Sequence, residues 1–162
     1  MIMAEQLETI QSFQKSAPVQ TVPIANCFGL EVYKSKPNIW PDSLSGALRR
    51  NPEKPESFDI YVNGDHHVNR RRFTIAHEIA HFVLHRDLIG DGISDDALYR
   101  SGLSNRVEAQ ANALAADILM PWHLIDPKID NGITDIGELA KIFQVSKSAM
   151  SIRMGVPYET NR

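Results

Sequence analysis

Cysteine is nearly absent from the sequence, since Cys27 is the single one among 162 residues. One thiol cannot form a disulfide within the chain, which fits a reducing compartment. Any metal site must therefore use histidine and carboxylate ligands. We expect the thiol itself, beside the apolar Phe28, to be buried as a small apolar group.

Long hydrophobic runs are also absent, because no apolar stretch approaches the roughly 20 residues that span a bilayer. Residues 1–14 are amphipathic and acidic, and they lack the charged start and the unbroken apolar run of a signal peptide. We therefore predict a cytoplasmic protein with no membrane partner.

The chain has no excess of positive charge, no internal repeat and no low-complexity segment. Its formal net charge is -3, so it offers no broad basic surface to nucleic acid. Hydrophobic residues make up 43% and charged residues 23%, which is ordinary for a globular protein. A chain of this length can bury a sizeable core in one compact domain.

Hydrophobic periodicity predicts an α+β fold with a small antiparallel sheet packed on a helical part. Asn69 and Ser146 are the expected N-caps of the helices at 70–86 and 147–154. We place a main core at 1–130, including an N-terminal helix, and a C-terminal helical pair packed on it at 131–162. The expected strands are 28–34, 45–50 and 56–63; the expected helices are 3–14, 70–86, 105–119, 135–143 and 147–154; residues 17–22 are expected to form a turn and 86–104 a long polar connection.

The stretch 73–85, FTIAHEIAHFVLH, contains the motif H-E-x-x-H in His77, Glu78 and His81. Residues four apart share one helix face, so the two imidazoles can point at one ion, as zinc requires. Glu78 is rotated by about 100° from His77, close enough to reach a water molecule whose pKa the ion lowers to about 7. Glu78 can take a proton from that water and later pass it to a leaving amine. The spacing is typical of zinc peptidases.

A surface helix with two solvated histidines is the other explanation of this motif. The residues on both sides of it are apolar, which predicts a core helix. The small residues Ala76 and Ala80 lie beside the histidines and leave room for an ion. These flanks favour a metal site.

A catalytic zinc needs a third protein ligand and one open position. Glu108 on the next predicted helix is a candidate, but Asn105 and Glu108 also have the spacing of a capping box. The spacing supports both readings equally. Asn112, one turn after Glu108, could orient a ligand from behind, whereas Asp87 and Asp117 are expected to be solvated.

Two segments of the chain resemble the ImmA/IrrE family of metallopeptidases. They are RRRFTIAHEIAHFVLH and, further on, EAQANALAADILMP. Leu114 stands where the family often has Phe, and Ala80 where Gly is common. The positions that match are Arg70, Arg72, Phe73, Thr74, Ala76, His77, Glu78, His81, Leu84 and His85, then Glu108, Ala111, Asn112, Ala115, Ala116, Leu119, Met120 and Pro121.

The resemblance implies a zinc site with His77, His81 and Glu108 as ligands and Glu78 as the catalytic acid and base. It also implies a zincin-like core, in which an edge strand along the cleft receives an extended peptide by strand addition. The segment FDIYVN at 58–63 lies near the place of such a strand. The metal in the cell could be Zn²⁺, Mn²⁺ or Fe²⁺, because the affinity order alone does not set occupancy.

Several other polar residues could support the site. His85, one turn after His81, has either a supporting role at the site or a place at the helix C-terminus. Of the three arginines at 70–72, Arg72 is the one that we expect before the others to pair with a carboxylate. Tyr99 could donate to an oxyanion, although an ordinary loop position is favoured. His66 is expected to be solvated.

The last two predicted helices have the spacing of a helix-turn-helix. A small core would come from Leu139, Ala140, Phe143, Val145, Ala149 and Met150. The side chains available to contact DNA are few, namely Lys147, Ser148, Ser151 and Arg153, so we do not expect DNA binding. Proteins that this chain resembles often pack such a segment against the peptidase core.

Zinc-dependent hydrolysis of a peptide bond in a specific protein is the function that the resemblance implies. The implied substrate is a helix-turn-helix repressor whose cleavage releases mobile-element or stress genes. A binding module that sequesters a repressor without cutting it, or one half of a toxin–antitoxin pair, is the main alternative. A metal-dependent hydrolase of a non-peptide bond is a third reading, which the H-E-x-x-H motif disfavours.

Overall fold

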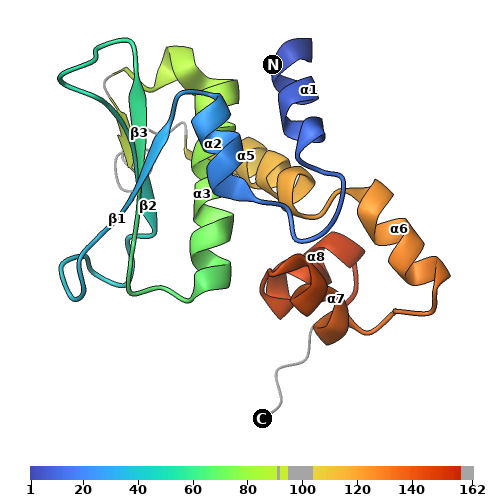
Figure 1. Cartoon of the computed structure of the whole chain (residues 1–162). Coiled ribbons are helices and arrows are strands. Elements are labelled where there is room, and N and C mark those ends of the chain that lie inside the picture. Colours follow the sequence, from blue (N-terminus) through green and yellow to red (C-terminus); the bar gives the residue numbers. More distant parts are fainter. Residues whose placement is uncertain (91, 95–103, 158–162) are drawn as a thin grey trace.

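The computed structural model describes residues 1–90, 92–94 and 104–157. The strands are β1 (Glu31–Lys34), β2 (Gly46–Arg50), β3 (Phe58–Val62) and β4 (Gly92–Ser94). The helices are α1 (Ala4–Ser12), α2 (Thr21–Cys27), α3 (Val68–His85), α5 (Ser104–Leu119), α6 (Trp122–Asp130), α7 (Ile136–Phe143) and α8 (Lys147–Met154), with a 3-10 turn, η1, at Arg86–Leu88. The sheet lies on one side, and α2 and α3 cover the same face of it (Figure 1). The predicted α+β class is confirmed.

The expectation of an antiparallel sheet is wrong at one pair of strands. Within the described residues the strand order is β1-β3-β2-β4, and β1 runs parallel to β3, with Val32 opposite Ile60. The connection at 35–45 reverses the chain between β1 and β2, and β3 then returns into the space between them. Alternation in the sequence predicts where strands lie but not which strands become neighbours.

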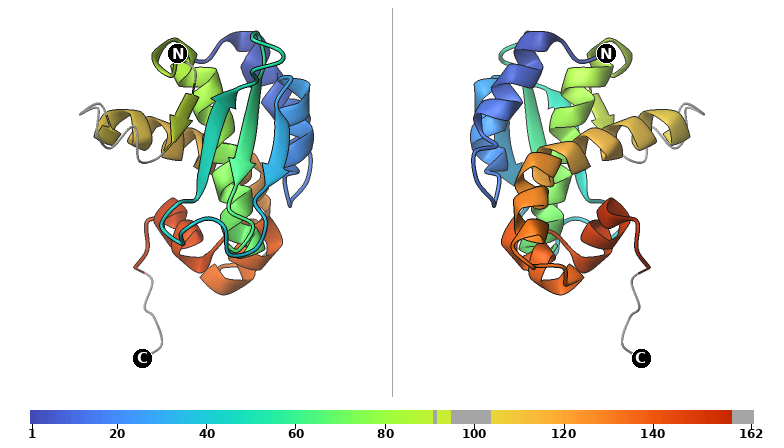
Figure 2. Two further views of the ribbon diagram at one scale, coloured as in Figure 1. Left: turned by 90° about the vertical axis from the view of Figure 1, so that its left-hand side faces the viewer. Right: turned by 90° about the vertical axis from the view of Figure 1, so that its right-hand side faces the viewer.

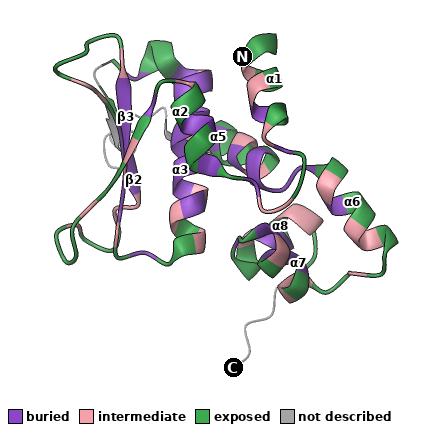
Figure 3. Cartoon of the chain, viewed as in Figure 1, coloured by how far each residue is buried: buried purple, intermediate pink, exposed green. Residues whose placement is uncertain are grey.

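Helix α3 runs along the sheet and is buried over most of its length (Figure 3). Ile79 is fully buried, and it belongs to one apolar cluster with Leu48 of β2 and Ile60 of β3. The helix begins two residues earlier than predicted, and the side chain of its N-cap, His67, accepts a hydrogen bond from the backbone N–H of Asn69. Asn69 is therefore inside the first turn, and the prediction that it caps the helix is wrong.

Helix α5 crosses α3 and packs closely against it, as both views in Figure 2 show. Val107, Ala111 and Ala115 are buried there. The two alanines are small enough to let the backbones approach closely. This crossing brings a face of α5 onto the part of α3 that carries the H-E-x-x-H motif.

Two short helices, α2 and α6, were not predicted. The sequence predicts a turn at 17–22, because Pro18 lies in it and Pro23 follows it, and no element between Pro121 and residue 135. Pro23 lies in the first turn of α2, where a backbone N–H has no partner within the helix in any case. Pro121 follows the end of α5 and occupies the N-cap position of α6. Cys27, the last residue of α2, is exposed, so the expectation that it is buried is wrong.

Helices α7 and α8 form nearly as predicted and join the rest of the chain through specific contacts. Ser146 caps α8 by accepting the backbone N–H of Ala149. Arg153 of α8 forms an ion pair with Asp117 of α5 (3.0 Å) and donates to the carbonyl of Met120. The boundary at 130/131 between core and helical pair stays a prediction. No helix in the described part of the chain is long and apolar enough to cross a membrane.

Candidate metal centre

His77 and His81 on α3 and Glu108 on α5 converge on one point. The Nε2 atom of His77 lies 3.0 Å from Oε2 of Glu108, and Nε2 of His81 lies 2.9 Å from Oε1. One ligand atom from each of the three residues lies within 4.8 Å of the other two. Such a set of two imidazoles and one carboxylate has the size and the donor chemistry of a zinc site.

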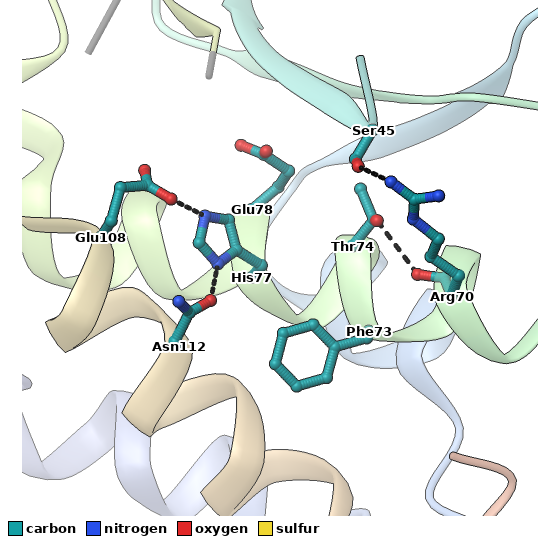
Figure 4. Close-up of a pocket in the computed structure, with 8 residues that line it drawn as sticks. All are labelled: Ser45, Arg70, Phe73, Thr74, His77, Glu78, Glu108 and Asn112. Atoms are coloured by element: carbon teal, nitrogen blue, oxygen red, sulfur yellow. Dashed lines mark hydrogen bonds and ion pairs between the residues drawn. The ribbon is translucent and has the colours of Figure 1, made fainter. Parts of the chain in front are cut away.

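Asn112 fixes the tautomer of His77. Its side-chain Oδ1 lies 2.8 Å from Nδ1 of His77 (Figure 4). An amide oxygen only accepts hydrogen bonds, so Nδ1 carries the proton, and in the neutral ring Nε2 presents its lone pair. The lone pair therefore points toward the carboxylate of Glu108.

A longer chain of hydrogen bonds fixes His81. Its Nδ1 lies 3.0 Å from Nδ1 of His85, and Nε2 of His85 lies 2.8 Å from Oε1 of Gln110. The ring of His85 therefore donates from Nε2 to the amide and accepts at Nδ1 from His81. This leaves a lone pair on Nε2 of His81. Three acceptors, two imidazole nitrogens and a carboxylate, thus face one another, an arrangement that a cation between them stabilises.

The electrostatics of the cluster favour the forms that bind a metal. Burial alone would raise the pKa of Glu108, but the close contacts with the rings of His77 and His81 outweigh it and lower the pKa to about 2. Burial also lowers the pKa of His81, and the contact with the carboxylate of Glu108 opposes this only in part. An ionised carboxylate and a neutral imidazole are the states that coordinate a metal ion.

A cavity opens over the cluster, and Glu78 lines it. Figure 4 shows the side chain of Glu78 beside that of His77, next to the strand side of the cavity. The carboxylate of Glu78 is almost fully buried, and strand β2 packs against it, since a Cβ on Gly46 would lie 3.5 Å from its Oε1. The residues that line the cavity are Ser45, Arg70, Phe73, Thr74, His77, Glu78, Glu108 and Asn112.

Other residues singled out in the sequence lie elsewhere. Arg72 meets no carboxylate among the described residues. Its guanidinium donates instead to the carbonyls of Val19, Phe143 and Gln144, so it joins α3 to the end of α7. The carbonyls at a helix C-terminus lack partners within the helix and carry negative partial charge. They therefore bind the guanidinium of Arg72 in place of the expected carboxylate.

The remaining candidates also differ from expectation. Asn105 lies inside α5 rather than before it, and the carboxylate of Glu108 contacts the two histidines. His66 is buried against the carbonyl of Asp42 (2.9 Å), so the expectation that it is solvated is wrong. Tyr99 lies outside the described residues.

The strand at 58–62 is not an edge strand. It is β3, which lies between β1 and β2, so its pairing edges are used. The edges of the sheet within the described residues are β1 and β4. β4 pairs antiparallel with β2, the strand that packs against Glu78.

Gln110 and Ser45 are the residues that sequence reasoning missed. Gln110 is two positions from Glu108 and from Asn112, a separation that places it on a different side of a helix. Ser45 is the first residue of the expected strand at 45–50 and carries no motif. No sequence pattern around either residue indicates its role, because that role depends on a residue distant in the sequence that contacts it in the fold.

Comparisons with known proteins show the family of the chain. The family model described as the IrrE N-terminal-like domain (Peptidase_M78) matches residues 25–154. Radiation response metalloprotease IrrE of Deinococcus radiodurans is 39% identical over 100 residues, and the protein of the same name from Deinococcus deserti is 37% identical over 100 residues. The matched part is 59% of this chain and 30% and 35% of those proteins, so it spans about a third of the curated relatives.

A solved structure, a Mycobacterium tuberculosis transcriptional regulator, has a similar fold. The TM-score is 0.61, and the likeness covers 96% of this chain and 48% of that chain. The sequences are only 18% identical, so this likeness concerns the fold alone.

Proposed function

The chain belongs to the IrrE N-terminal-like domain family of peptidases, and from this premise we propose that it is a zinc-dependent endopeptidase that cuts a specific protein. The observation that carries the proposal is the convergence of His77, His81 and Glu108 in a cavity that Glu78 also lines. The donor set suits zinc, and a set of three protein ligands leaves one position open, as a catalytic site requires.

In the proposed reaction the chain supplies one proton carrier and a fixed set of ligands. A bound Zn²⁺ supplies Lewis acidity, which makes water acidic and polarises the scissile carbonyl. Glu78 accepts the proton of the attacking water and later delivers it to the leaving amine. Asn112 holds His77, and His85 with Gln110 holds His81, so that both imidazoles keep their orientation through the cycle.

The proposal includes a zincin-like core in which β4 is the strand that receives the substrate. β4 is an edge strand within the described residues and neighbours β2, which packs against Glu78. An extended peptide that pairs with this edge would lie along the metal centre. We also propose that α7 and α8 form a helix-turn-helix-like pair that supports the core rather than binding DNA.

The proposed substrate class is a helix-turn-helix repressor or an antitoxin, which follows from the resemblance to the ImmA/IrrE family. A non-cleaving module that sequesters such a protein is the competing function. The two make different predictions for Glu78→Gln. A peptidase loses its activity and keeps its metal, whereas a sequestering module keeps its biological effect.

The experiment that tests the proposal uses Glu78→Gln as bait in lysate of the source organism. Captured proteins are incubated with zinc-loaded wild type and, in parallel, with zinc-loaded Glu78→Gln, and the fragments are mapped by mass spectrometry. Cleavage of one protein at one site by the wild type alone supports the peptidase. A captured partner that stays whole with the zinc-loaded wild type contradicts it in favour of the sequestering module.

A further inference from the structure

The cavity over the metal centre continues along α3 to Arg70. Arg70, Thr74 and Glu78 are spaced by four residues, so they share one face of the helix and line the same cavity. Their backbone positions cover roughly 12 Å from Arg70 to Glu78, at 1.5 Å per residue. An extended peptide advances about 3.3 Å per residue. Arg70 is therefore within reach of a substrate residue about three positions from the scissile bond.

Arg70 carries a positive charge that the described part of the chain does not compensate. No carboxylate among the described residues forms an ion pair with it, and its side chain donates a hydrogen bond to the hydroxyl of Ser45 (3.3 Å). It lies in the first turn of α3, where the helix dipole disfavours a cation. Its neighbour Arg72 has a structural role in binding the carbonyls at the end of α7. Nothing comparable accounts for Arg70.

Ser45, the partner of Arg70, is held in place from the other side. The fully buried Asn63 donates to the carbonyls of Pro41 and Leu44, and its backbone N–H donates to the carbonyl of Ser45 (2.8 Å). His66 contacts the carbonyl of Asp42. The backbone that carries the hydroxyl facing Arg70 is thus held in place before any ligand binds.

The two ends of the cavity differ in charge. Glu78 and Glu108 lie at the metal end, Arg70 and Ser45 lie at the other, and the ring of Phe73 lines the wall (Figure 4). With a divalent ion bound, the charges of the ion, Glu78 and Glu108 offset one another at the first end, so the uncompensated charge of Arg70 attracts an anionic group of a ligand to the second end. The guanidinium is a planar fork that binds a carboxylate through two parallel hydrogen bonds, and the serine hydroxyl adds a third donor.

We propose that Arg70 and Ser45 form a subsite for a substrate carboxylate close to the scissile bond. This inference rests on the proposed peptidase function, because it assigns one end of the same cavity to the substrate. The carboxylate is either the side chain of an Asp or Glu or the free C-terminus of the substrate. In either case Arg70 determines specificity and positions the peptide relative to the metal centre.

Binding to the inactive Glu78→Gln protein tests the subsite without any need for turnover. The probe is a set of fluorescent decapeptides with Glu, Gln or Lys at each central position, each made with a free and with an amidated C-terminus. We expect one position at which Glu binds about 10-fold to 100-fold more tightly than Gln, the range for a hydrogen bond to a charged group. Arg70→Gln in the same background should remove this preference, and Arg70→Glu should transfer it to Lys.

Arg71 provides the matched control, since it is the next residue and lines a different groove, with Lys34 and Gln144. Arg71→Glu should leave the preference for Glu unchanged. If amidation of the C-terminus, rather than the Glu-to-Gln change, weakens binding in an Arg70-dependent way, the carboxylate comes from the chain end. If Arg70→Gln and Arg71→Gln alter the Glu-to-Gln ratio equally, or if there is no ratio to alter, the subsite is overturned.

Cleavage of the same peptides by zinc-loaded wild type separates this inference from the proposed function. Cleavage without any Arg70-dependent preference overturns the subsite and leaves the peptidase standing. Arg70-dependent binding without cleavage by the wild type overturns the peptidase and leaves the carboxylate subsite standing.

Discussion

The Nδ1 atoms of His81 and His85 lie 3.0 Å apart, and both rings are buried. His85 reaches the side chain of Gln110 through its other nitrogen. A buried histidine that is fixed by a neighbour in this way can present only one nitrogen to a metal ion. The state of His81 therefore depends on two residues that do not touch the proposed ion.

His85→Ala should weaken zinc binding by about 10-fold to 100-fold, the usual effect of removing a partner behind a metal ligand. Titration against a chelator of known zinc affinity measures the change. His123→Ala is the matched control, because His123 contacts the carbonyl of Gln14 and not the cluster. Equal zinc affinities for the wild type and His85→Ala would show that the contact between the rings does not orient His81.

Glu108→Ala should abolish stoichiometric zinc binding, because it removes one of three ligands and leaves two imidazoles. Elemental analysis of the purified protein measures the metal content. Glu138, an exposed glutamate on α7, provides the control Glu138→Ala, which should retain one zinc per chain. Full occupancy in Glu108→Ala would contradict the assignment of the three ligands.

Arg72→Ala should destabilise the fold by about 2–4 kcal/mol, since it leaves three carbonyls without a charged donor. The free energy of unfolding, measured by urea titration, gives the loss. Arg71→Ala, a less buried neighbour, should change it by less than about 0.5 kcal/mol. Because Arg72 contacts the ends of other elements and not the cluster, folded Arg72→Ala should still bind zinc. Loss of zinc without loss of stability would point to a direct role at the site.

Gly46→Ala should cost about 1–3 kcal/mol of stability and reduce cleavage as well. A Cβ on Gly46, in the strand that packs against Glu78, would overlap the methyl group of Thr74 and come within 2.9 Å of the carbonyl oxygen of Tyr61 on β3. Thr74→Ser removes that methyl group and should recover part of the loss in the double variant. Thermal unfolding and cleavage assays measure the two effects.

Gly137→Ala is the comparison for the glycine at β2. Its nearest neighbours are the end of the flexible Lys147 side chain, at 3.3 Å, and Oδ2 of Asp135, at 3.1 Å, which caps α7 through the N–H of Glu138 and has to shift by only a few tenths of an ångström. Alanine in a helix should then stabilise the protein by about 0.4–1 kcal/mol. If the two glycine variants behave alike, close packing of β2 on α3 is not the reason for Gly46.

Local patterns in the sequence were sufficient for the helix that carries the motif. His77 and His81 share a face because of their spacing alone, and helix α3 was predicted to within two residues at its start. Glu108 was different, because its spacing from Asn105 also fits a capping box. Only the crossing of α5 over α3, a tertiary feature, brings its carboxylate to the histidines.

The misses have a common physical cause. The parallel pairing of β1 with β3 depends on the path of the chain through and after the connection at 35–45. The alternation of apolar and polar residues within a strand does not predict that path. Arg72 was expected to pair with a carboxylate, because a buried cation usually has an anionic partner. In the structure it binds the carbonyls at the end of α7 instead. Gln110 acts on His81 only through His85, so it became visible only when the helices were packed together.

The most direct test of the account compares zinc content and cleavage in the wild type and in Glu78→Gln, with the captured protein as substrate. The account predicts one zinc per chain in both, and cleavage that is slower in Glu78→Gln by about 10²-fold to 10⁴-fold, the contribution of a general base. Chelation should stop the wild type, and added zinc should restore it. Equal cleavage by the two zinc-loaded proteins would contradict the assignment of Glu78, and no cleavage by either would contradict the peptidase itself.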